Sequence, residues 1–551
     1  MTTGTAARPG LLESLPATID GYDLAAERGR LHLIPDAVVR RRRLNRGSAV
    51  VAVAADRMET AWHEAVRKRH GEVILPTTLA PDSPVVELGW PATGPFVRCA
   101  AGVYLDLYLG VGQKVLDGGH PRVREAIRRL DELDLLTRRE INTDDFLAAA
   151  EGVEGLHLPQ DVAALAGEAA AAAFPAAGPW KAFLSNSGTE AVEAAVKLAW
   201  QVKHKLFLEQ HGFETLEAVA KDLGIPRMPE MDFDQSRKEP VLADYPFFMV
   251  GCWRGFHGRS LGSLHFTTSK KAQRAGYPQV RWIRRVRYNG SPAELGDMMD
   301  ARPIREILAA PGGVRAVVEA GRIPRDLFAG FLAEPFQGEG GYLPGDPAWF
   351  RGVAAIVREN QGLLLIDEVQ SVARTGTIFF SEQLGVVPDC IATAKGMVIG
   401  ITLARADLAK HLHAGWHSNT WGGGKIFDNQ WSWAVLDALL HHRDPVLEGL
   451  SYMDNCRVKG KYFAAGLERL RERHPAVLSG FDQRGLLVGL SVRRRADVIR
   501  LGWRRGLKLL GCGPSGDVAR LRLVFLADTL AREIEETLRV LDLVLADVAK
   551  A

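Results

Sequence analysis

The stretch Leu363-Leu364-Leu365-Ile366-Asp367-Glu368-Val369-Gln370 starts with four apolar residues, which are followed by the carboxylate of Asp367. A second apolar run, Cys390-Ile391-Ala392, is followed closely by Lys395. Runs of this length are typical of buried strands in a parallel sheet. Open α/β sheets bind ligands beyond the carboxyl ends of their strands. We therefore expect Asp367 and Lys395 to lie at one edge of such a sheet.

A carboxylate and an amine at one edge suit a cofactor that has a pyridine nitrogen at one end and an aldehyde at the other. Asp367 would keep the nitrogen protonated, and Lys395 would form a Schiff base with the aldehyde. The pair therefore predicts pyridoxal 5′-phosphate as the cofactor and these two residues as catalytic. A surface lysine after a strand, and an aspartate that caps a helix or forms a salt bridge, are the alternative interpretations.

A phosphate site is predicted where the expected strand Lys181-Ala182-Phe183-Leu184 runs into Ser185-Asn186-Ser187-Gly188-Thr189-Glu190-Ala191. The residues that follow have the apolar spacing of a helix with one buried face. The amino end of that helix would offer free N–H groups and a positive dipole to an anion, and Gly188 would let the backbone come close. Ordinary helix capping is the alternative.

The composition is that of a soluble globular protein with more than one domain. The chain has 551 residues, which is too long for a single core, and 47% of them are hydrophobic and 25% charged. A net charge of +3 does not indicate a nucleic-acid or membrane partner. The five cysteines are odd in number and contain no CxxC pair, which favours reduced thiols and no metal site. Without a signal-like amino terminus or an apolar run of about 18 residues, the sequence predicts a cytoplasmic protein.

Strands and helices alternate in the central block, which predicts an α/β fold with a mostly parallel sheet in a large domain and a smaller α+β domain beside it. The expected strands of the large domain are Lys181–Leu184, Phe247–Cys252, Phe331–Ala333, Leu363–Ile366 and Cys390–Thr393. The expected domain ranges are an amino-terminal extension at 1–75, the first part of the small domain at 76–159, the large domain at 160–425, and the rest of the small domain at 426–551. A polar stretch at about 203–245 is interpreted as a surface insertion within the large domain.

The amino-terminal extension contains the basic run Arg40-Arg41-Arg42-Arg43. Nucleic-acid binding would usually bring interleaved aromatic residues and basicity throughout the domain, and both are missing here. A solvated or subunit-contact segment is the favoured interpretation.

Several motifs together resemble the class III aminotransferases, which are pyridoxal-phosphate enzymes of fold type I. The resemblance covers about residues 90 to 540 and keeps the order and spacing of the family. It rests on the Ser-Gly-Thr-Glu-Ala helix start, Phe256-His257-Gly258-Arg259, Glu334-Pro335-Phe336-Gln337-Gly338-Glu339-Gly340-Gly341, Leu365–Gln370 and Lys395. The segment Asn419-Thr420-Trp421-Gly422-Gly423 looks closest to the 4-aminobutyrate and lysine 6-aminotransferase branches.

The resemblance implies a role for each of these positions. Lys395 would also be the base that moves a proton from the substrate carbon to the cofactor. Thr420 would reach the phosphate bound by the other subunit, which implies a homodimer with sites at the interface. The remaining cofactor contacts implied are Gly188 and Thr189 at the phosphate, Phe256 and His257 at the ring, Val369 on its opposite face and Gln370 at its oxygen. Core packing is the alternative for the ring contacts.

The substrate residues are also taken from the resemblance. Arg259 would grip the donor carboxylate, because a planar guanidinium matches a carboxylate in two parallel bonds. Glu339 would neutralise a second arginine while an ω-amino donor is bound and release it when 2-oxoglutarate arrives. That arginine is Arg520 or Arg522, of which the Arg-x-Arg pattern favours Arg520. Glu334 would line the pocket or support Arg259.

The resulting hypothesis is an aminotransferase that passes nitrogen from an ω-amino acid or diamino acid, of the 4-aminobutyrate or L-lysine type, to 2-oxoglutarate by a ping-pong mechanism. The expected partners are therefore an amino donor and a 2-oxo acid. After Lys395, the segment Gly396-Met397-Val398-Ile399-Gly400 is poorer in glycine than is common in the family, so the donor stays open. An amino-acid racemase or epimerase is the alternative within the family, and a non-catalytic binding protein is a distant one.

Overall fold

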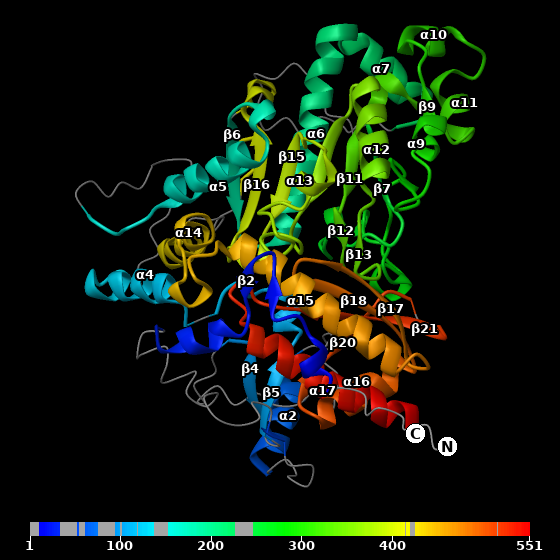
Figure 1. Cartoon of the computed structure of the whole chain (residues 1–551). Helices are drawn as coiled ribbons and strands as arrows, with labels where there is room; N and C mark the ends of the chain where they lie inside the picture. The colour runs from blue at the N-terminus through cyan, green and yellow to red at the C-terminus, as the bar shows by residue number, and fades with distance from the viewer. Residues whose placement is uncertain are drawn as a thin grey trace.

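A seven-stranded sheet forms the centre of the upper part of the molecule (Figure 1). The computed structural model describes residues 10–33, 52–53, 61–74, 94–99, 102–117, 119–136, 153–225, 246–413, 415–418, 425–514 and 516–550. In spatial order the strands are β6 (Trp180–Ser185), β16 (Gly400–Arg405), β15 (Cys390–Thr393), β14 (Leu363–Asp367), β11 (Phe328–Ala333), β7 (Phe248–Cys252) and β8 (Ile283–Val286).

The sheet is mostly parallel, as predicted. Strand β16 runs antiparallel to both of its neighbours, β15 and β6, while β15, β14, β11, β7 and β8 pair in parallel. All five predicted strands lie in this sheet. Strand β11 is buried along its whole length, which is what a central strand covered on both faces requires. The α/β fold class is thereby confirmed.

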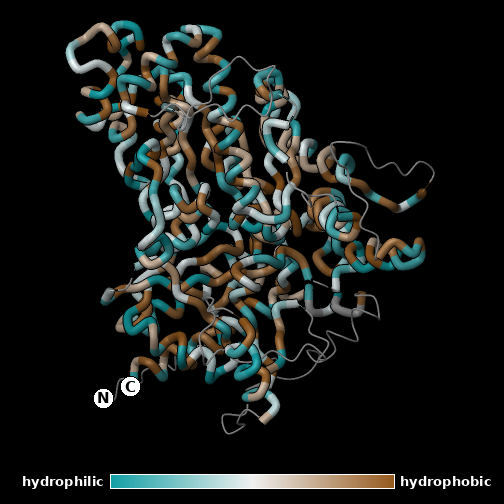
Figure 2. Tube along the Cα trace, turned by 180° about the vertical axis from the view of Figure 1, so that it is seen from behind, coloured by the Kyte–Doolittle hydropathy of each residue, from teal (hydrophilic) through white to brown (hydrophobic). Residues whose placement is uncertain are grey.

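Helices pack against this sheet and carry its connections. Helix α6 lies against β15 and β16, α5 against β6, and α12 against β14. The helices in chain order are α2 (Ala61–Val73), α3 (Leu109–Gly112), α4 (Pro121–Glu132), α5 (Pro159–Ala173), α6 (Gly188–His211), α7 (Phe213–Asp222), α8 (Leu261–Leu264), α9 (Ala293–Met298), α10 (Ile304–Ala309), α11 (Gly313–Glu319), α12 (Pro347–Glu359), α13 (Ser381–Leu384), α14 (Ile426–His441), α15 (Tyr452–Arg473), α16 (Arg495–Arg504) and α17 (Ala531–Lys550). Hydrophobic segments gather inside this arrangement (Figure 2).

A second, antiparallel sheet lies below the first and packs with α15, α16 and α17 (Figure 1). Its strands, in spatial order, are β17 (Leu478–Arg484), β18 (Leu487–Arg493), β21 (Val518–Val524) and β20 (Leu510–Cys512). A third sheet joins distant parts of the chain, because β5 pairs in parallel with a strand about 400 residues later. Its strands are β3 (Ala52–Val53), β4 (Phe96–Cys99), β5 (Gly102–Asp106) and β19 (Leu507–Lys508). The described strands are completed by three short pairs: β1 (Thr18–Ile19) with β2 (Tyr22–Asp23), β9 (Met299–Asp300) with β10 (Ile323–Pro324), and β12 (Phe336–Gln337) with β13 (Leu343–Pro344).

The first part of the expected surface insertion belongs to the core instead. Helices α6 and α7 continue to Asp222, and they bury Phe207, Leu216 and Val219 at no more than 1% exposure. Their apolar faces repeat at helical spacing, which the polar residues between them obscure in the sequence. Residues 226–245 lie outside the described residues, as does the basic run Arg40–Arg43. Among the described residues, no helix is long and apolar enough to cross a membrane.

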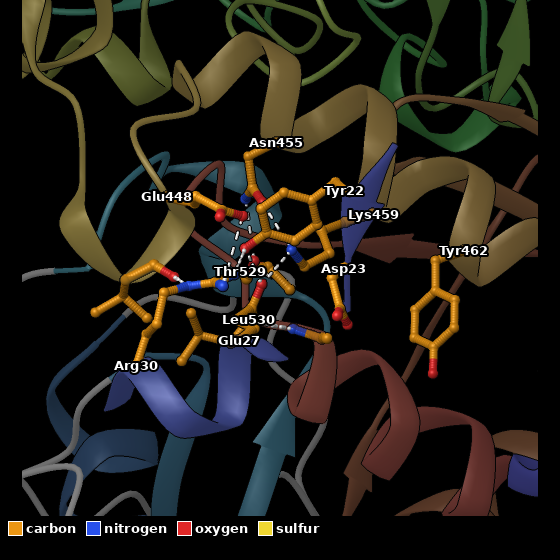
Figure 3. A network of polar contacts seen from close by, with 12 residues as sticks. Tyr22, Asp23, Glu27, Arg30, Glu448, Asn455, Lys459, Tyr462, Thr529 and Leu530 are labelled. Carbon is orange, nitrogen blue, oxygen red and sulfur yellow. Dashed lines mark hydrogen bonds and ion pairs between the residues drawn. The ribbon is translucent and has the colours of Figure 1, made fainter. Parts of the chain in front are cut away.

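The segment 10–33 is anchored in the interior by one carboxylate, Glu27 (Figure 3). This segment contains η1 (Leu12–Ser14), β1 (Thr18–Ile19), β2 (Tyr22–Asp23) and η2 (Ala26–Leu33). Lys459 on α15 donates to Glu27 Oε2 at 2.6 Å, and the Tyr22 hydroxyl donates to the same oxygen at 2.7 Å. The other oxygen accepts from the Ala531 N–H at 2.6 Å, at the amino end of α17, where a negative charge is favoured.

Substitution of Glu27 by Gln is expected to destabilise the fold by about 3 kcal/mol. Both ionic side chains are buried, with 0% of Lys459 and 3% of Glu27 exposed, and removing one partner of such a pair leaves the other charge uncompensated. Chemical denaturation, followed by far-ultraviolet circular dichroism, would measure the change in the first unfolding transition.

A matched control is offered by Lys461, which also links α15 to this segment. Its ion pair with Asp20 has a similar length of 2.6 Å, but the side chains are 59% and 50% exposed. Lys461→Met should therefore cost less than about 1 kcal/mol. Equal losses for Glu27→Gln and Lys461→Met would contradict the role assigned to burial.

Candidate active site

A cavity of about 200 Å³ lies at the carboxyl ends of β14 and β15. The two strands are parallel neighbours in register, with Asp367 opposite Ala392, so Asp367 and Lys395 leave the sheet at the same edge. The residues that line the cavity are Ser187, Gly188, Thr189, Phe256, His257, Gly258, Glu334, Asp367, Val369, Gln370 and Lys395. Most of the residues predicted to contact the cofactor thus surround one space.

Asp367 is fixed by two donors. His257 Nδ1 lies 2.8 Å from Asp367 Oδ2, and the Val369 N–H donates to Oδ1 at 3.0 Å. Burial alone would lower the pKa of His257, but the hydrogen bond and the negative charge of Asp367 raise it above its usual value. The backbone N–H of His257 in turn donates to the Thr267 hydroxyl at 2.9 Å. The imidazole therefore holds and orients one carboxylate oxygen of Asp367.

Lys395 follows β15 in the short turn η7 (Lys395–Met397), with its backbone in the left-handed region at φ 48°. A side chain in this region costs on the order of 1–3 kcal/mol and is found mainly where a site requires it. Burial, together with the positive charge of Arg522, lowers the pKa of Lys395 to about 8. A substantial fraction of the neutral amine, which is the form that accepts a proton, is then present near neutral pH.

Glu334 is a second buried carboxyl group in the cavity. It accepts from the backbone N–H groups of Phe256 and Gly338, each at 2.9 Å. Burial raises its pKa to about 7, since the opposing effect of His257 is offset by the negative charge of Asp367. Glu334 thus ties the segment that carries Phe256 and His257 to the segment that carries Glu339. Its hydrogen bonds go to these backbones and not to Arg259, so the geometry favours its predicted place in the pocket lining.

The amino end of α6 forms one wall of the cavity. Ser187 caps the helix, and a Cβ added to Gly188 would lie 2.7 Å from Val369 Cγ1, so only glycine lets the helix start come this close. The Thr189 hydroxyl lies 2.7 Å from the Ser263 hydroxyl and 2.9 Å from that of Ser260. These contacts hold the helix start, with its N–H groups, at the edge of the cavity.

The residues present fit pyridoxal phosphate. A fixed carboxylate, a lysine with a lowered pKa, and a helix amino terminus surround one cavity, and they match the pyridine nitrogen, the aldehyde and the phosphate in turn. Glycines clear the space: a Cβ on Gly258 would collide with Thr189, and one on Gly338 would collide with Gln370. Phe256 and Val369 supply the flat or apolar surfaces that a ring needs.

Glu339 forms its ion pair with Arg522. The Arg522 Nη2 atom lies 2.5 Å from Glu339 Oε1, and 3% and 11% of the two side chains are exposed. The preference for Arg520 as this partner was wrong, because Arg520 is engaged elsewhere. It donates to the Gly341 carbonyl at 2.9 Å and to Asp482 at 2.7 Å. Both arginines share a face of β21, so the sequence pattern could not separate them.

Arg259 does not line the cavity. Arg259 is exposed and forms no ion pair within the described part of the chain; its guanidinium lies 6.0 Å from the centre of the Phe256 ring. Thr420 lies outside the described residues. Glu339 and Arg522 do not line the cavity either, yet their charges act on Lys395 in opposite directions.

Several functional contacts lie outside the predicted set. Ser260 and Ser263, which position Thr189, follow the Phe256–Arg259 motif directly, and Glu193 accepts from the Ser260 hydroxyl at 2.5 Å. Lys270 lies 3.1 Å from Glu339. The proximity of Ser260 to the Phe256–Arg259 motif was the one signal available in the sequence, while Lys270 is contributed by a loop whose path the sequence does not reveal.

Residues 92–542 match the family described as aminotransferase class-III. An acetylornithine aminotransferase of Gloeobacter violaceus is 29% identical over 450 residues, which is 80% of this chain and 89% of that protein. An acetylornithine aminotransferase of Brucella suis biovar 1 is 31% identical over 317 residues, which is 56% of this chain and 61% of that protein.

Solved structures show the same fold at lower identity. The lysine aminotransferase from M. tuberculosis has a TM-score of 0.64 at 23% identity, with 88% of this chain and 99% of that chain covered. The ornithine aminotransferase from Toxoplasma gondii ME49 has a TM-score of 0.63 at 18% identity, with 90% and 96% covered.

Proposed function

Because the chain belongs to the class III aminotransferase family, we propose that it moves the amino group of an ω-amino acid or a diamino acid to 2-oxoglutarate by a ping-pong mechanism. Enzymes of this family depend on pyridoxal 5′-phosphate. The proposal concerns which donor and which acceptor this chain takes.

The buried ion pair between Glu339 and Arg522 carries the proposal. One site must accept a donor whose reacting end carries no carboxylate and an acceptor that has a carboxylate in the same place. A movable ion pair solves this problem, since Glu339 hides the charge of Arg522 in one half-reaction and exposes it in the other. Nε and Nη1 of Arg522 are buried and have no hydrogen-bond partner in the described part of the chain. These donors are available to a substrate carboxylate.

The other residues act on the nitrogen and proton transfers. When bound, the cofactor stores the amino group between the two half-reactions and delocalises the charge left when the substrate carbon loses a proton. Lys395 would hold the cofactor at rest and, once released, would carry the proton. Asp367, oriented by His257, would keep the ring nitrogen protonated. Phe256 and Val369 would enclose the ring, and Gln370 would contact its oxygen.

The donor is proposed to be held by Arg259, whose guanidinium forms no ion pair with the described residues and is therefore available. The relatives are named for acetylornithine, and the structural neighbours are named for ornithine and lysine. Each of these three compounds has an amino group far from a carboxylate. L-lysine, L-ornithine, N-acetylornithine and 4-aminobutyrate are therefore the donors to test.

The proposal is tested by the two half-reactions taken separately. Each donor is added to the holoenzyme without acceptor, and the absorption of the cofactor is followed; 2-oxoglutarate is then added to reverse the change. We expect one of these donors to shift the spectrum and 2-oxoglutarate to restore it. If only α-amino acids without a distal amine act as donors, the proposed substrate class is excluded.

Substitution of Arg259 by Ala is expected to raise the KM of the donor by an amount that corresponds to about 2–3 kcal/mol, because a charge-assisted pair is lost. An amine that lacks the carboxylate should react with both enzymes alike. Arg259→Lys keeps the charge but loses the planar fork, so its KM should be intermediate. Steady-state kinetics with both amines make the comparison, and equal losses on both would remove Arg259 from the donor site.

We also propose a homodimer in which Thr420 of each subunit contacts the phosphate held by the other. Resemblance to the family supports this arrangement. Thr420→Val should weaken retention of the cofactor during dialysis while leaving the oligomeric state, measured by analytical ultracentrifugation, unchanged. A sedimenting monomer with full activity would exclude the proposal.

A further inference from the structure

Glu339 has a second cationic partner, Lys270, which the switch described above does not require. Lys270 Nζ lies 3.1 Å from Glu339 Oε2, while Arg522 contacts the other oxygen, Oε1. The Glu339 carboxylate is therefore shared between two cations that differ in their exposure to solvent. Arg522 is almost fully buried, but 46% of the Lys270 side chain is exposed.

The backbone holds both sides of this contact in place. The N–H groups of Thr268 and Ser269 donate to the Gly255 carbonyl at 2.8 and 3.1 Å, which fixes the loop before Lys270 next to the Phe256 segment. The Gly513 N–H donates to the Glu339 carbonyl at 2.9 Å. With both backbones anchored, we expect Glu339 to release Arg522 by a movement of its side chain.

We propose that Lys270 is a positioning residue that holds Glu339 after it releases Arg522, and so sets the affinity for a 2-oxo acid acceptor. The inference rests on the proposed function, because it needs Arg522 to bind the acceptor.

The physical basis is a difference between two states. While Glu339 contacts both cations, Lys270 and Arg522 repel each other and share one negative charge. Once Glu339 leaves Arg522, whose charge is then met by the acceptor carboxylate, Lys270 becomes the main counter-charge of Glu339. Lys270 therefore stabilises the released state more than the paired state. Without Lys270, release from Arg522 would leave the Glu339 carboxylate without a counter-charge in a partly buried position, which costs free energy.

Lys270→Met should weaken the apparent affinity for the acceptor 2-oxoglutarate, seen as a rise in its KM by about threefold to fivefold, which is the range of a partly exposed ion pair. The KM of succinate semialdehyde, an acceptor that has a distal carboxylate but none beside its reacting carbonyl, and that of the amino donor should stay within the error of measurement. The dissociation constant of glutarate, a dicarboxylate that cannot react, should rise by the same factor when measured by titration calorimetry on the holoenzyme. Lys270→Arg should retain the wild-type values. Lys271→Met, a neighbouring exposed lysine, is the matched control and should change none of them.

A double-mutant cycle with Glu339→Gln separates action through Glu339 from direct attraction of the acceptor. In the Glu339→Gln background, Lys270→Met should leave the KM of the dicarboxylic acceptor unchanged. A persistent effect there would show that Lys270 acts on the substrate directly, and equal effects on succinate semialdehyde and 2-oxoglutarate would show a general disturbance. Either result overturns the inference.

Failure of the proposed function itself would be visible in the wild-type enzyme. If the wild type does not prefer 2-oxoglutarate over succinate semialdehyde, Arg522 is not an acceptor site and both proposals fall. If that preference holds but Lys270→Met leaves the affinities for 2-oxoglutarate and glutarate unchanged, the role of Lys270 alone is excluded.

Discussion

Lys395→Ala is expected to reduce turnover by at least about 10³-fold, because in the proposed mechanism this one side chain both anchors the cofactor and transfers the proton. Burial and the charge of Arg522 lower the pKa of this lysine to about 8, so the amine is suited to act as a base near neutral pH. Alanine removes the nucleophile and the base together. The absorption band of the lysine-bound cofactor should disappear, although cofactor added in excess can still enter the cavity.

Two further measurements make this prediction specific. A small primary amine such as methylamine should restore part of the turnover, since it replaces the missing base without replacing the side chain. Lys271→Ala should keep full activity and the absorption band. A Lys395→Ala enzyme that turns over at the wild-type rate would remove this residue from the reaction.

Much of the fold could be predicted because its central strands are buried on both faces. Runs such as Leu363–Ile366 contain only apolar residues, so the local sequence itself indicates that they are buried. Strand β8 is different, since its residues Ile283-Arg284-Arg285-Val286 include two arginines, and strand β16 begins at a glycine. Each of these two strands is held by backbone hydrogen bonds to its neighbours in the sheet. The composition of the strand itself does not reveal those neighbours.

The site could be predicted where adjacent strands or a single motif bring residues together. Asp367 and Lys395 end or follow neighbouring strands, so strand order places both at one edge. Contacts between distant loops could not be predicted in this way. The choice between Arg520 and Arg522 depends on which one finds Glu339, and the contact of Lys270 with Glu339 depends on the path of a loop. Both are consequences of tertiary packing.

Asp367→Asn is expected to lower turnover by about 10²-fold to 10³-fold, which is the usual loss when one preorganised electrostatic partner is removed. Asparagine keeps the shape and still accepts the hydrogen bond from the Val369 N–H, but it cannot hold a proton on the ring nitrogen by charge. The fall should appear in kcat more than in the KM of either substrate, because the charge matters most when the substrate carbon has lost its proton. Asp389→Asn is the matched control. Asp389 accepts from the Leu364 N–H at 2.8 Å at the opposite ends of the same two strands, so its loss should affect stability without that selective fall in kcat.

A second consequence of Asp367→Asn concerns pH and does not depend on turnover. His257 has a raised pKa in the folded protein because of Asp367. A histidine of this kind adds stability that is fully present below its unfolded pKa of about 6.5 and is lost as the pH rises through the raised folded value. The variant lacks this contribution, so its thermal midpoint should fall further below that of the wild type at pH 6 than at pH 9. A difference that is the same at both pH values would show that Asp367 does not raise the pKa of His257, and the orientation of Asp367 by a charged imidazole would then have to be abandoned.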